Sequence, residues 1–211
     1  GKLKNIKEII ENGSSGSLVG DPPLISPLLW TCISTGKKAE KHGILDYYSN
    51  KYDLQARQIW DFLLDDGFKV GIYRDLSALE LKEVEDGFFI PSFYSFEEGA
   101  SPQRLSYIHE MDLQVREDRE KQQSLLSYIK MFWNLLKLGM PLSRLIKIIK
   151  NRIFFGFKKD YKHRFYKRKR IEFLIHTSLF VKLLKKHLPD FTILYENSVD
   201  SLSHVYWKDY E

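Results

Sequence analysis

Two short segments near opposite ends of the chain carry residues that could do chemistry. The first is SPLLWTCISTGKKAEKHGI, residues 26–44, in which Ser26 and Pro27 precede an apolar run. This pattern predicts a helix with Ser26 at its N-cap, Pro27 at its first position and Gly36 at its end. Ser26 is then either a simple cap, or a nucleophile beside unpaired N–H groups and a dipole end that favour a phosphate.

The second segment is DFTILYENSVDSLSHVYW, residues 190–207, where Asp200 and His204 stand four apart after a predicted strand. In parallel α/β sheets, ligands bind beyond the carboxyl ends of the strands. On a helical turn, side chains four apart point the same way, about 6 Å from each other. Such a pair could share one zinc-like ion. The simpler alternative is an Asp that caps a helix with a His nearby.

The elements that must position these residues follow an α/β pattern, in which a helix, a glycine and a short β-branched strand succeed one another. Apolar periodicity predicts helices over residues 3–11, 26–35 and 53–67, a buried strand over 68–73 and a further strand over 190–198. Residues 83–103 are expected to form a loop with strand fragments.

After about residue 112 the pattern is helical to about residue 187, with breaks expected at Pro141 and Gly156. The prediction is therefore an α/β fold with a parallel-sheet core, interrupted by a mostly helical basic insert. Its parts are residues 1–112, the first part of the core with the nucleophile segment; 113–187, the insert or cap; and 188–211, the returning strand with the metal-ligand segment.

Positive charge is concentrated in the insert. Residues 137–170 hold thirteen Lys and Arg against one acid, Asp160, in a chain whose net charge is +5. A solvated amphipathic cap and a surface for anionic substrate, nucleic acid or membrane headgroups both fit this pattern. Sequence-specific DNA binding is not expected, because no base-reading motif is present. One predicted helical stripe in this region comprises Leu142, Leu145, Ile146, Ile149 and Ile153.

Composition and cysteine content narrow the class of protein. Hydrophobic residues make up 43% of the chain and aromatic residues 14%, which suffices for a sizeable core. Cys32 is the single cysteine, so no internal disulfide can form, and a reducing, cytoplasmic compartment is favoured. The sequence shows no signal-peptide pattern and no apolar run long enough to span a bilayer. We interpret it as a segment of a longer protein.

Taken in order, these motifs resemble the alkaline phosphatase superfamily, in particular its type I phosphodiesterase/nucleotide pyrophosphatase branch. In that branch a Ser or Thr nucleophile stands just before an apolar-aromatic run that leads into Thr-Gly and His-Gly-Ile, as in residues 26–44. FKVGIY, EDGFFIPSF and LPDFTILYENSVDSLSHVYW are similar to the strand, the Gly-Phe-hydrophobic-Pro stretch and the metal segment that follow. The resemblance covers about residues 3–110 and 188–208, but not the insert.

The resemblance implies that Ser26 is the nucleophile and that Asp200 and His204 are two ligands of one metal. It implies two divalent ions, expected to be zinc, that activate a hydroxyl otherwise poorly nucleophilic at neutral pH. The expected activity is metal-dependent hydrolysis of an anionic phosphodiester or pyrophosphate through a covalent phospho-enzyme. The family's first Asp ligand, its Asp-His pair and its further His have no candidates here, so this segment alone is expected to be inactive.

Two other functions fit the sequence. One is a non-catalytic module whose basic insert binds polyanions. The other is a sulfatase, phosphomonoesterase or phosphotransferase of the same superfamily, because substrate choice in such folds depends on inserts and loops.

Several further residues have predicted roles. His42 is predicted to be structural, and Cys32 to be a small buried hydrophobic residue. Thr31 and Thr35 are rival hydroxyls that should bond back to the preceding helical turn. Arg74 could reach a phosphate or simply sit at a strand end.

Overall fold

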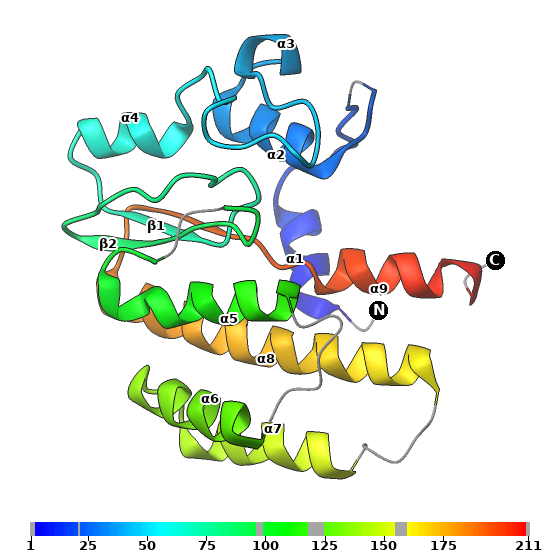
Figure 1. The fold of residues 1–211 in the computed structure, drawn as a ribbon. Coiled ribbons are helices and arrows are strands. Elements are labelled where there is room, and N and C mark those ends of the chain that lie inside the picture. The colour runs from blue at the N-terminus through cyan, green and yellow to red at the C-terminus, as the bar shows by residue number, and fades with distance from the viewer. Residues whose placement is uncertain (1–2, 21, 96–98, 118–124, 155–159, 210–211) are drawn as a thin grey trace.

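The computed structural model describes residues 3–20, 22–95, 99–117, 125–154 and 160–209. In this part of the chain, a parallel sheet of order β2-β1-β3 consists of β1 (Val70–Tyr73), β2 (Gly87–Ile90) and β3 (Phe191–Leu194) (Figure 1). Val70 is in register with Gly87 on one side and with Phe191 on the other. The predicted α/β class is confirmed. Both predicted strands are present but shorter than predicted, since β1 begins at Val70 and β3 ends at Leu194.

Helices account for most of the remaining described chain. Four of them precede β1: α1 (Lys4–Asn12), α2 (Ser26–Thr35), α3 (Ala39–His42) and α4 (Ile59–Asp65). Between β2 and β3 the chain forms η1 (Gln103–Leu105), α5 (Ser106–Glu117), α6 (Leu125–Lys137), α7 (Leu142–Phe154) and α8 (Tyr161–His187). After β3 come α9 (Ser198–Tyr206) and the short η2 (Trp207–Asp209). Among the described residues, no helix is long and apolar enough to cross a membrane.

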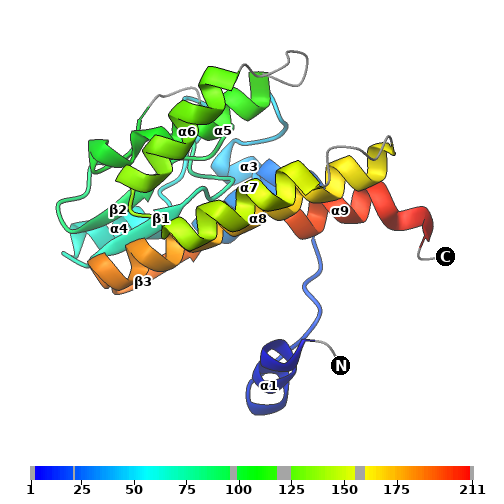
Figure 2. The same cartoon turned by 90° about the horizontal axis from the view of Figure 1, so that it is seen from below.

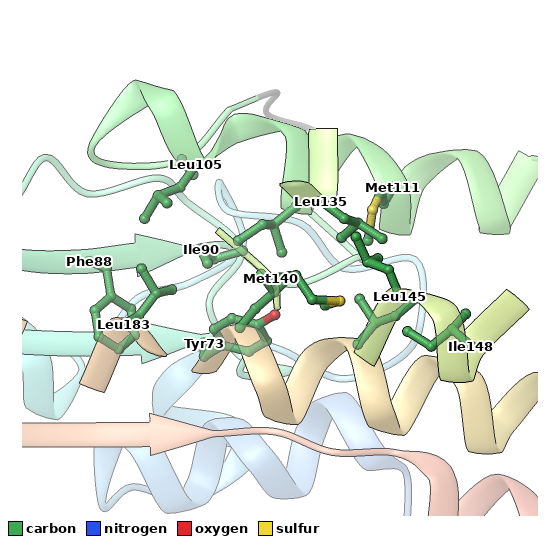
Figure 3. Packing of buried hydrophobic residues seen from close by; sticks show 14 residues of the cluster. Tyr73, Phe88, Ile90, Leu105, Met111, Leu135, Met140, Leu145, Ile148 and Leu183 are labelled. Atoms are coloured by element: carbon green, nitrogen blue, oxygen red, sulfur yellow. The ribbon is translucent and has the colours of Figure 1, made fainter. Parts of the chain in front are cut away.

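One face of the sheet is covered by α5 and α8, and α6 and α7 form a further layer outside them (Figures 1 and 2). Tyr73, Phe88 and Ile90 project from the sheet into this side and are fully buried. They pack in one cluster with Leu105 of η1 and Leu183 of α8, while α6 and α7 contribute Leu135 and Leu145 (Figure 3). The long helix α8 is therefore part of the main core rather than a peripheral cap.

The other face of the sheet packs against α4. Trp60 of α4 is fully buried with Val70, Ile72 and Phe89, and its ring makes an edge contact with Phe89 at 6.1 Å between centroids. Along β1, Ile72 and Tyr73 belong to opposite clusters, as the two-residue period of a strand requires. Both faces are covered, which explains why β1 reads as a continuous apolar run.

The predicted helix over residues 53–67 is wrong in its first half, since α4 begins only at Ile59. A capping box starts the helix there. The Asp61 backbone N–H donates to the Gln58 side chain, and the Gln58 backbone N–H donates to the Asp61 carboxylate at 2.8 Å. The residues before Gln58 direct their backbone N–H groups elsewhere, as Gln55 N–H donates to the His42 carbonyl at 2.9 Å. Apolar spacing alone did not reveal this competition.

The predicted stripe of α7 is only partly right. Among residues 142–150, whose side chains the structure describes, Leu145 and Ile148 are buried, whereas Leu142, Ile146 and Ile149 are exposed. Three of these five apolar residues therefore face solvent. The break at Pro141 is found between α6 and α7. Gly156 and the Ile153 side chain lie outside what the structure describes.

Candidate active site

Ser26 is the first residue of α2, and it is followed by Pro27. The prediction that Ser26 is the N-cap is wrong by one position, because Ile25 occupies the N-cap in an extended conformation. No side-chain capping bond is present, and the Ser26 hydroxyl has no hydrogen-bond partner among the described residues. The hydroxyl is half-buried at the amino end of the helix, where unpaired N–H groups favour an anion. It is thus not engaged in local structure.

The far end of α2 is fixed to the core by buried hydroxyl groups. Ser77 Oγ donates to Ser34 Oγ at 2.9 Å, and Gln58 Nε2 donates to the same oxygen at 3.1 Å. Burial raises the pKa of Asp75, whose carboxylate accepts the Ser77 backbone N–H at 2.9 Å. Gly36 ends the helix with a left-handed conformation, φ 65°, and donates its N–H to the Cys32 carbonyl. These contacts set the direction of the helix that begins at Ser26.

The other hydroxyls of α2 are used within the helix, as predicted. Thr31 Oγ1 donates to the Pro27 carbonyl at 2.8 Å, and Thr35 Oγ1 donates to the Thr31 carbonyl at 2.6 Å. Both are the back-bonds expected of mid-helix threonines. Ser26 therefore differs from its two rivals in having an uncommitted oxygen.

His42 is fully buried and forms part of the support of α2. Its Nδ1 accepts the Ile44 N–H at 3.1 Å, and its Nε2 lies 3.3 Å from Cys32 Sγ. Burial lowers the pKa of His42, which favours the neutral ring with Nε2 protonated. The prediction for Cys32 needs correction: the side chain is half-buried and bonds a histidine instead of acting only as a hydrophobic residue.

Asp200 and His204 lie on α9, which begins four residues after the end of β3. Asp200 Oδ1 and His204 Nε2 are 3.6 Å apart, and the side chains are 63% and 81% exposed. Two ligand atoms of a tetrahedral zinc, each about 2.0–2.1 Å from the ion, are separated by about 3.3 Å. The donor types and the spacing of this pair therefore fit one shared ion. The described residues contain no group of three or more His, Cys, Asp or Glu that could hold a metal.

Helix α9 is held by α8, which sequence reasoning assigned to the insert. Tyr206 donates its hydroxyl hydrogen to the Lys162 carbonyl at 2.9 Å, and the Lys162 ammonium lies 5.4 Å from the centre of the Tyr206 ring. At the other end of α9, the Ser198 hydroxyl is 3.3 Å from the Lys169 carbonyl. The long helix thus supports both ends of the element that carries Asp200 and His204.

An aromatic contact connects the segments that carry Ser26 and Asp200. Trp30, one turn after Ser26, meets Tyr195 edge-on with ring centroids 5.0 Å apart. Tyr195 directly follows β3, and its pKa is raised by burial and then by the negative charge of Asp200. The start of α2 and the loop before α9 therefore meet near the carboxyl end of β3, although they are far apart in the sequence.

A buried polar cluster lies beside this region, and sequence reasoning did not identify it. Arg74 follows β1 in a left-handed conformation, φ 62°, and its Nε is 2.6 Å from Asp112 Oδ2 of α5, a close pair whose N–H is not well aligned. His176 Nε2 of α8 is 3.5 Å from Asp112 Oδ1, and its Nδ1 is 3.0 Å from the Tyr73 hydroxyl. We call these four residues the Arg74 cluster. Arg74 is committed to Asp112 and is not available to a phosphate.

Burial dominates the electrostatics of the Arg74 cluster. It raises the pKa of Asp112 to about 6, although the positive charge of Arg74 opposes the shift. It also lowers the pKa of His176 well below the ordinary value, and the charges of Arg74 and Lys169 lower it further. The imidazole is thus neutral, and a neutral ring can accept the Tyr73 hydroxyl hydrogen at Nδ1.

The comparison with family models decides between the classes of protein that this geometry allows. The model of the type I phosphodiesterase/nucleotide pyrophosphatase family matches residues 1–211. The chain belongs to this family. Its match includes the helical residues 113–187, to which the resemblance seen in the motifs did not extend. No curated protein and no solved structure matches the chain.

Membership in the type I phosphodiesterase/nucleotide pyrophosphatase family makes the chain a phosphoester hydrolase at the level of the family, and enzymes of this family generally use divalent metals. The side chains present are compatible with that requirement. An exposed carboxylate and an imidazole on one face of α9 are donors that zinc-like ions accept.

Proposed function

We propose that this chain contributes the nucleophile and part of one metal site to a metal-dependent phosphodiesterase or pyrophosphatase. Ser26 is the proposed nucleophile, and Asp200 and His204 are proposed ligands of one of two divalent ions, with zinc the preferred metal. The observation that carries the proposal is the Asp200–His204 pair, because its two donor atoms are exposed and correctly spaced within a phosphodiesterase family member.

In the proposed reaction, Ser26 Oγ attacks the phosphorus of the substrate, and the bond between phosphorus and the leaving-group oxygen breaks in line. The Ser26 proton passes to water as the oxygen–phosphorus bond forms, and the leaving oxygen takes up a proton from water. A water oxygen then attacks the phosphorus, the bond between Ser26 Oγ and phosphorus breaks, the phosphate product leaves, and Oγ regains a proton. When bound, divalent ions would lower the pKa of the hydroxyl and stabilise the charge that develops on the phosphoryl oxygens.

The protein side chains and backbone have distinct tasks in this scheme. The amino end of α2 presents N–H groups and a partial positive charge to the phosphoryl oxygens. The Ser34–Ser77–Gln58 contacts fix the direction of α2, and the α8–α9 contacts fix the helix of Asp200 and His204. The Trp30–Tyr195 contact joins the two halves. Nucleophile and ligands are in this way held by rigid elements, which positioning of a reactive group requires.

The test is replacement of Ser26 by Ala in the full-length protein, with a generic aryl phosphodiester as substrate. Turnover should fall by at least about 1,000-fold, because loss of the attacking oxygen removes the covalent route. The fold should persist, since no capping bond depends on Ser26. Thr35→Ala is the matched control, because it removes a hydroxyl from the far end of the same helix, where the oxygen is bonded to the backbone of Thr31 and Lys37. Near-normal turnover of folded Ser26→Ala would exclude Ser26 as nucleophile.

A further inference from the structure

A second polar site lies far from α2 and α9. A cavity of about 350 Å³ opens where η1 and the start of α5, the end of α6 and the end of α8 meet. Figure 1 shows these three helix ends together on one side of the molecule, whereas α9 extends from the opposite end of the sheet. The volume is within the range of small-molecule sites. Nothing in the proposed reaction uses this cavity.

The charge of this cavity is entirely of one sign. Its lining includes Arg104, Lys137, Lys182 and Lys186, and none of the described lining residues is an acid. None of these four cations forms an ion pair among the residues that the structure describes. Gathering like charges is unfavourable unless an anion compensates them. The neighbouring His187 senses this field: burial lowers its pKa first, and the charges of Lys186 and Arg104 lower it further.

One of the four cations is held in place by the backbone. Lys182 Nζ donates to the Leu138 carbonyl at 2.7 Å, and it occupies the space beside Gly139 where any other side chain would overlap it. Gly139 also adopts φ +76°, a conformation that favours glycine. The turn between α6 and α7 therefore leaves room for an ammonium group at the cavity wall. A positioned donor costs a ligand less in lost side-chain entropy than a mobile one.

The remainder of the lining is apolar. Leu105, Ile108, Leu179 and Leu183 line the cavity and are nearly inaccessible to solvent, which places them at its floor. An inorganic anion alone would contact the cations and leave the partly buried apolar lining above this floor, Tyr107 and Leu138, in water. A ligand with a phosphate group and an apolar body would satisfy both parts, since each buried methylene contributes about 0.8 kcal/mol.

We propose that this basic cavity is a binding site for an organic phosphate, in which the phosphate contacts Arg104, Lys137, Lys182 and Lys186 and an apolar body covers the leucine floor. Either a soluble phosphate ester or the headgroup region of a phospholipid can supply this chemistry. The site is independent of the proposed catalytic residues.

Calorimetry on the full-length protein in chelator tests this site, because removing divalent ions suppresses phosphate binding at the proposed active site. The probes are hexyl phosphate, inorganic phosphate and hexanol, with phosphatidic-acid vesicles as a separate arm. Hexyl phosphate should bind at least about tenfold more tightly than inorganic phosphate, because its chain buries several methylenes. Hexanol should not bind measurably.

Two adjacent lysines of α8 provide the matched variants. Lys186 lines the cavity, whereas Lys185 does not, and both are exposed. Lys186→Gln should weaken hexyl phosphate binding by about tenfold, as expected for loss of one charge-assisted contact, while Lys185→Gln changes it by less than about twofold. Both variants should keep full hydrolytic activity. The binding result therefore tests the cavity alone, and the activity of Ser26→Ala tests the proposed function alone.

The vesicle arm distinguishes the two sources. If Lys186→Gln weakens binding of the vesicles but not of hexyl phosphate, the site is assigned to a lipid headgroup. If Lys186→Gln weakens binding of hexyl phosphate in solution, the site is assigned to a soluble ester. Equal effects of the Lys185 and Lys186 variants with both probes would overturn the proposal, because a general surface charge would then explain the binding. Equal affinity for hexyl and inorganic phosphate would also overturn it, because the leucine floor would have no role.

Discussion

The Arg74 cluster and the Asp200–His204 pair are both carboxylate–histidine arrangements at the carboxyl side of the sheet, but their surroundings differ completely. In the Arg74 cluster, Asp112 and His176 are buried and bonded to Arg74 and Tyr73. In the other pair, Asp200 and His204 are exposed and lie 3.6 Å from each other. The first arrangement pairs its charges away from solvent, whereas the second presents both side chains to solvent.

This contrast shows why a perturbed pKa is not sufficient to locate an active site. The strongest perturbations among the carboxylates and histidines are those of the buried cluster, where desolvation is the main cause. Those groups connect α5 and α8 to β1 and are buried, which keeps a substrate away from them. Access of a ligand to donor atoms, rather than the size of a pKa shift, distinguishes the two sites.

The largest expected effect comes from removing the exposed pair. Asp200→Asn combined with His204→Ala should lower phosphodiesterase turnover by more than about 100-fold, because residues that would bind the metal directly matter at least as much as residues that only orient them. Stability should change by less than about 0.5 kcal/mol, since both side chains are exposed. Activity, bound-metal content and urea unfolding measure these effects. Ser203→Ala on the same helix is the control, and unchanged metal content in the double variant would refute the assignment.

Removing one partner of the buried cluster should mainly lower stability, whereas removing the exposed pair mainly lowers activity. Asp112→Ala should cost about 3–5 kcal/mol of unfolding free energy, because it removes the carboxylate paired with the buried Arg74 guanidinium and leaves only the charge of Glu172 acting on it. The double variant Arg74→Met/Asp112→Leu should recover part of that loss, because no unpaired charge remains. Urea unfolding of both variants measures this. If Asp112→Ala is no less stable than the double variant, the two residues do not act as an ion pair.

The pH dependence of stability gives a smaller effect within the same cluster. Since the folded-state pKa of His176 is lowered, its contribution is complete above about pH 6.5 and is lost as pH falls towards the lowered pKa. Between pH 7.5 and 5, the free energy of unfolding of the wild type should fall by about 2 kcal/mol more than that of His176→Gln. Arg74, Asp112, Lys169 and Glu172 face this region, so comparing wild type with variant at each pH is needed to isolate the His176 contribution. A stability difference that stays constant with pH would contradict a neutral buried imidazole.

Local patterns predicted the elements whose determinants lie within a few residues. Ser26-Pro27 and Gly36 set the ends of α2 to within one residue, and the spacing of Asp200 and His204 predicted their shared helical face. The start of α4 was missed because Leu54 continues the helical spacing of the apolar residues, whereas the capping box formed by Gln58 and Asp61 starts the helix at Ile59. The Arg74 cluster was also missed, since Arg74, Asp112 and His176 come from three elements that only tertiary packing brings together. The support of α9 by α8 has the same origin.

The central claim is that Ser26 forms a covalent bond to phosphorus. The most direct measurement is rapid acid quenching of the full-length protein during turnover of an aryl phosphodiester, followed by peptide mass spectrometry. The account predicts a phosphoryl adduct on Ser26, absent from Ser26→Ala and greatly reduced in Asp200→Asn/His204→Ala. Thr31, Ser34 and Thr35 on the same helix should carry no adduct, because their hydroxyls are engaged in hydrogen bonds. An adduct on any other residue, or hydrolysis by Ser26→Ala at the wild-type rate, would contradict the account.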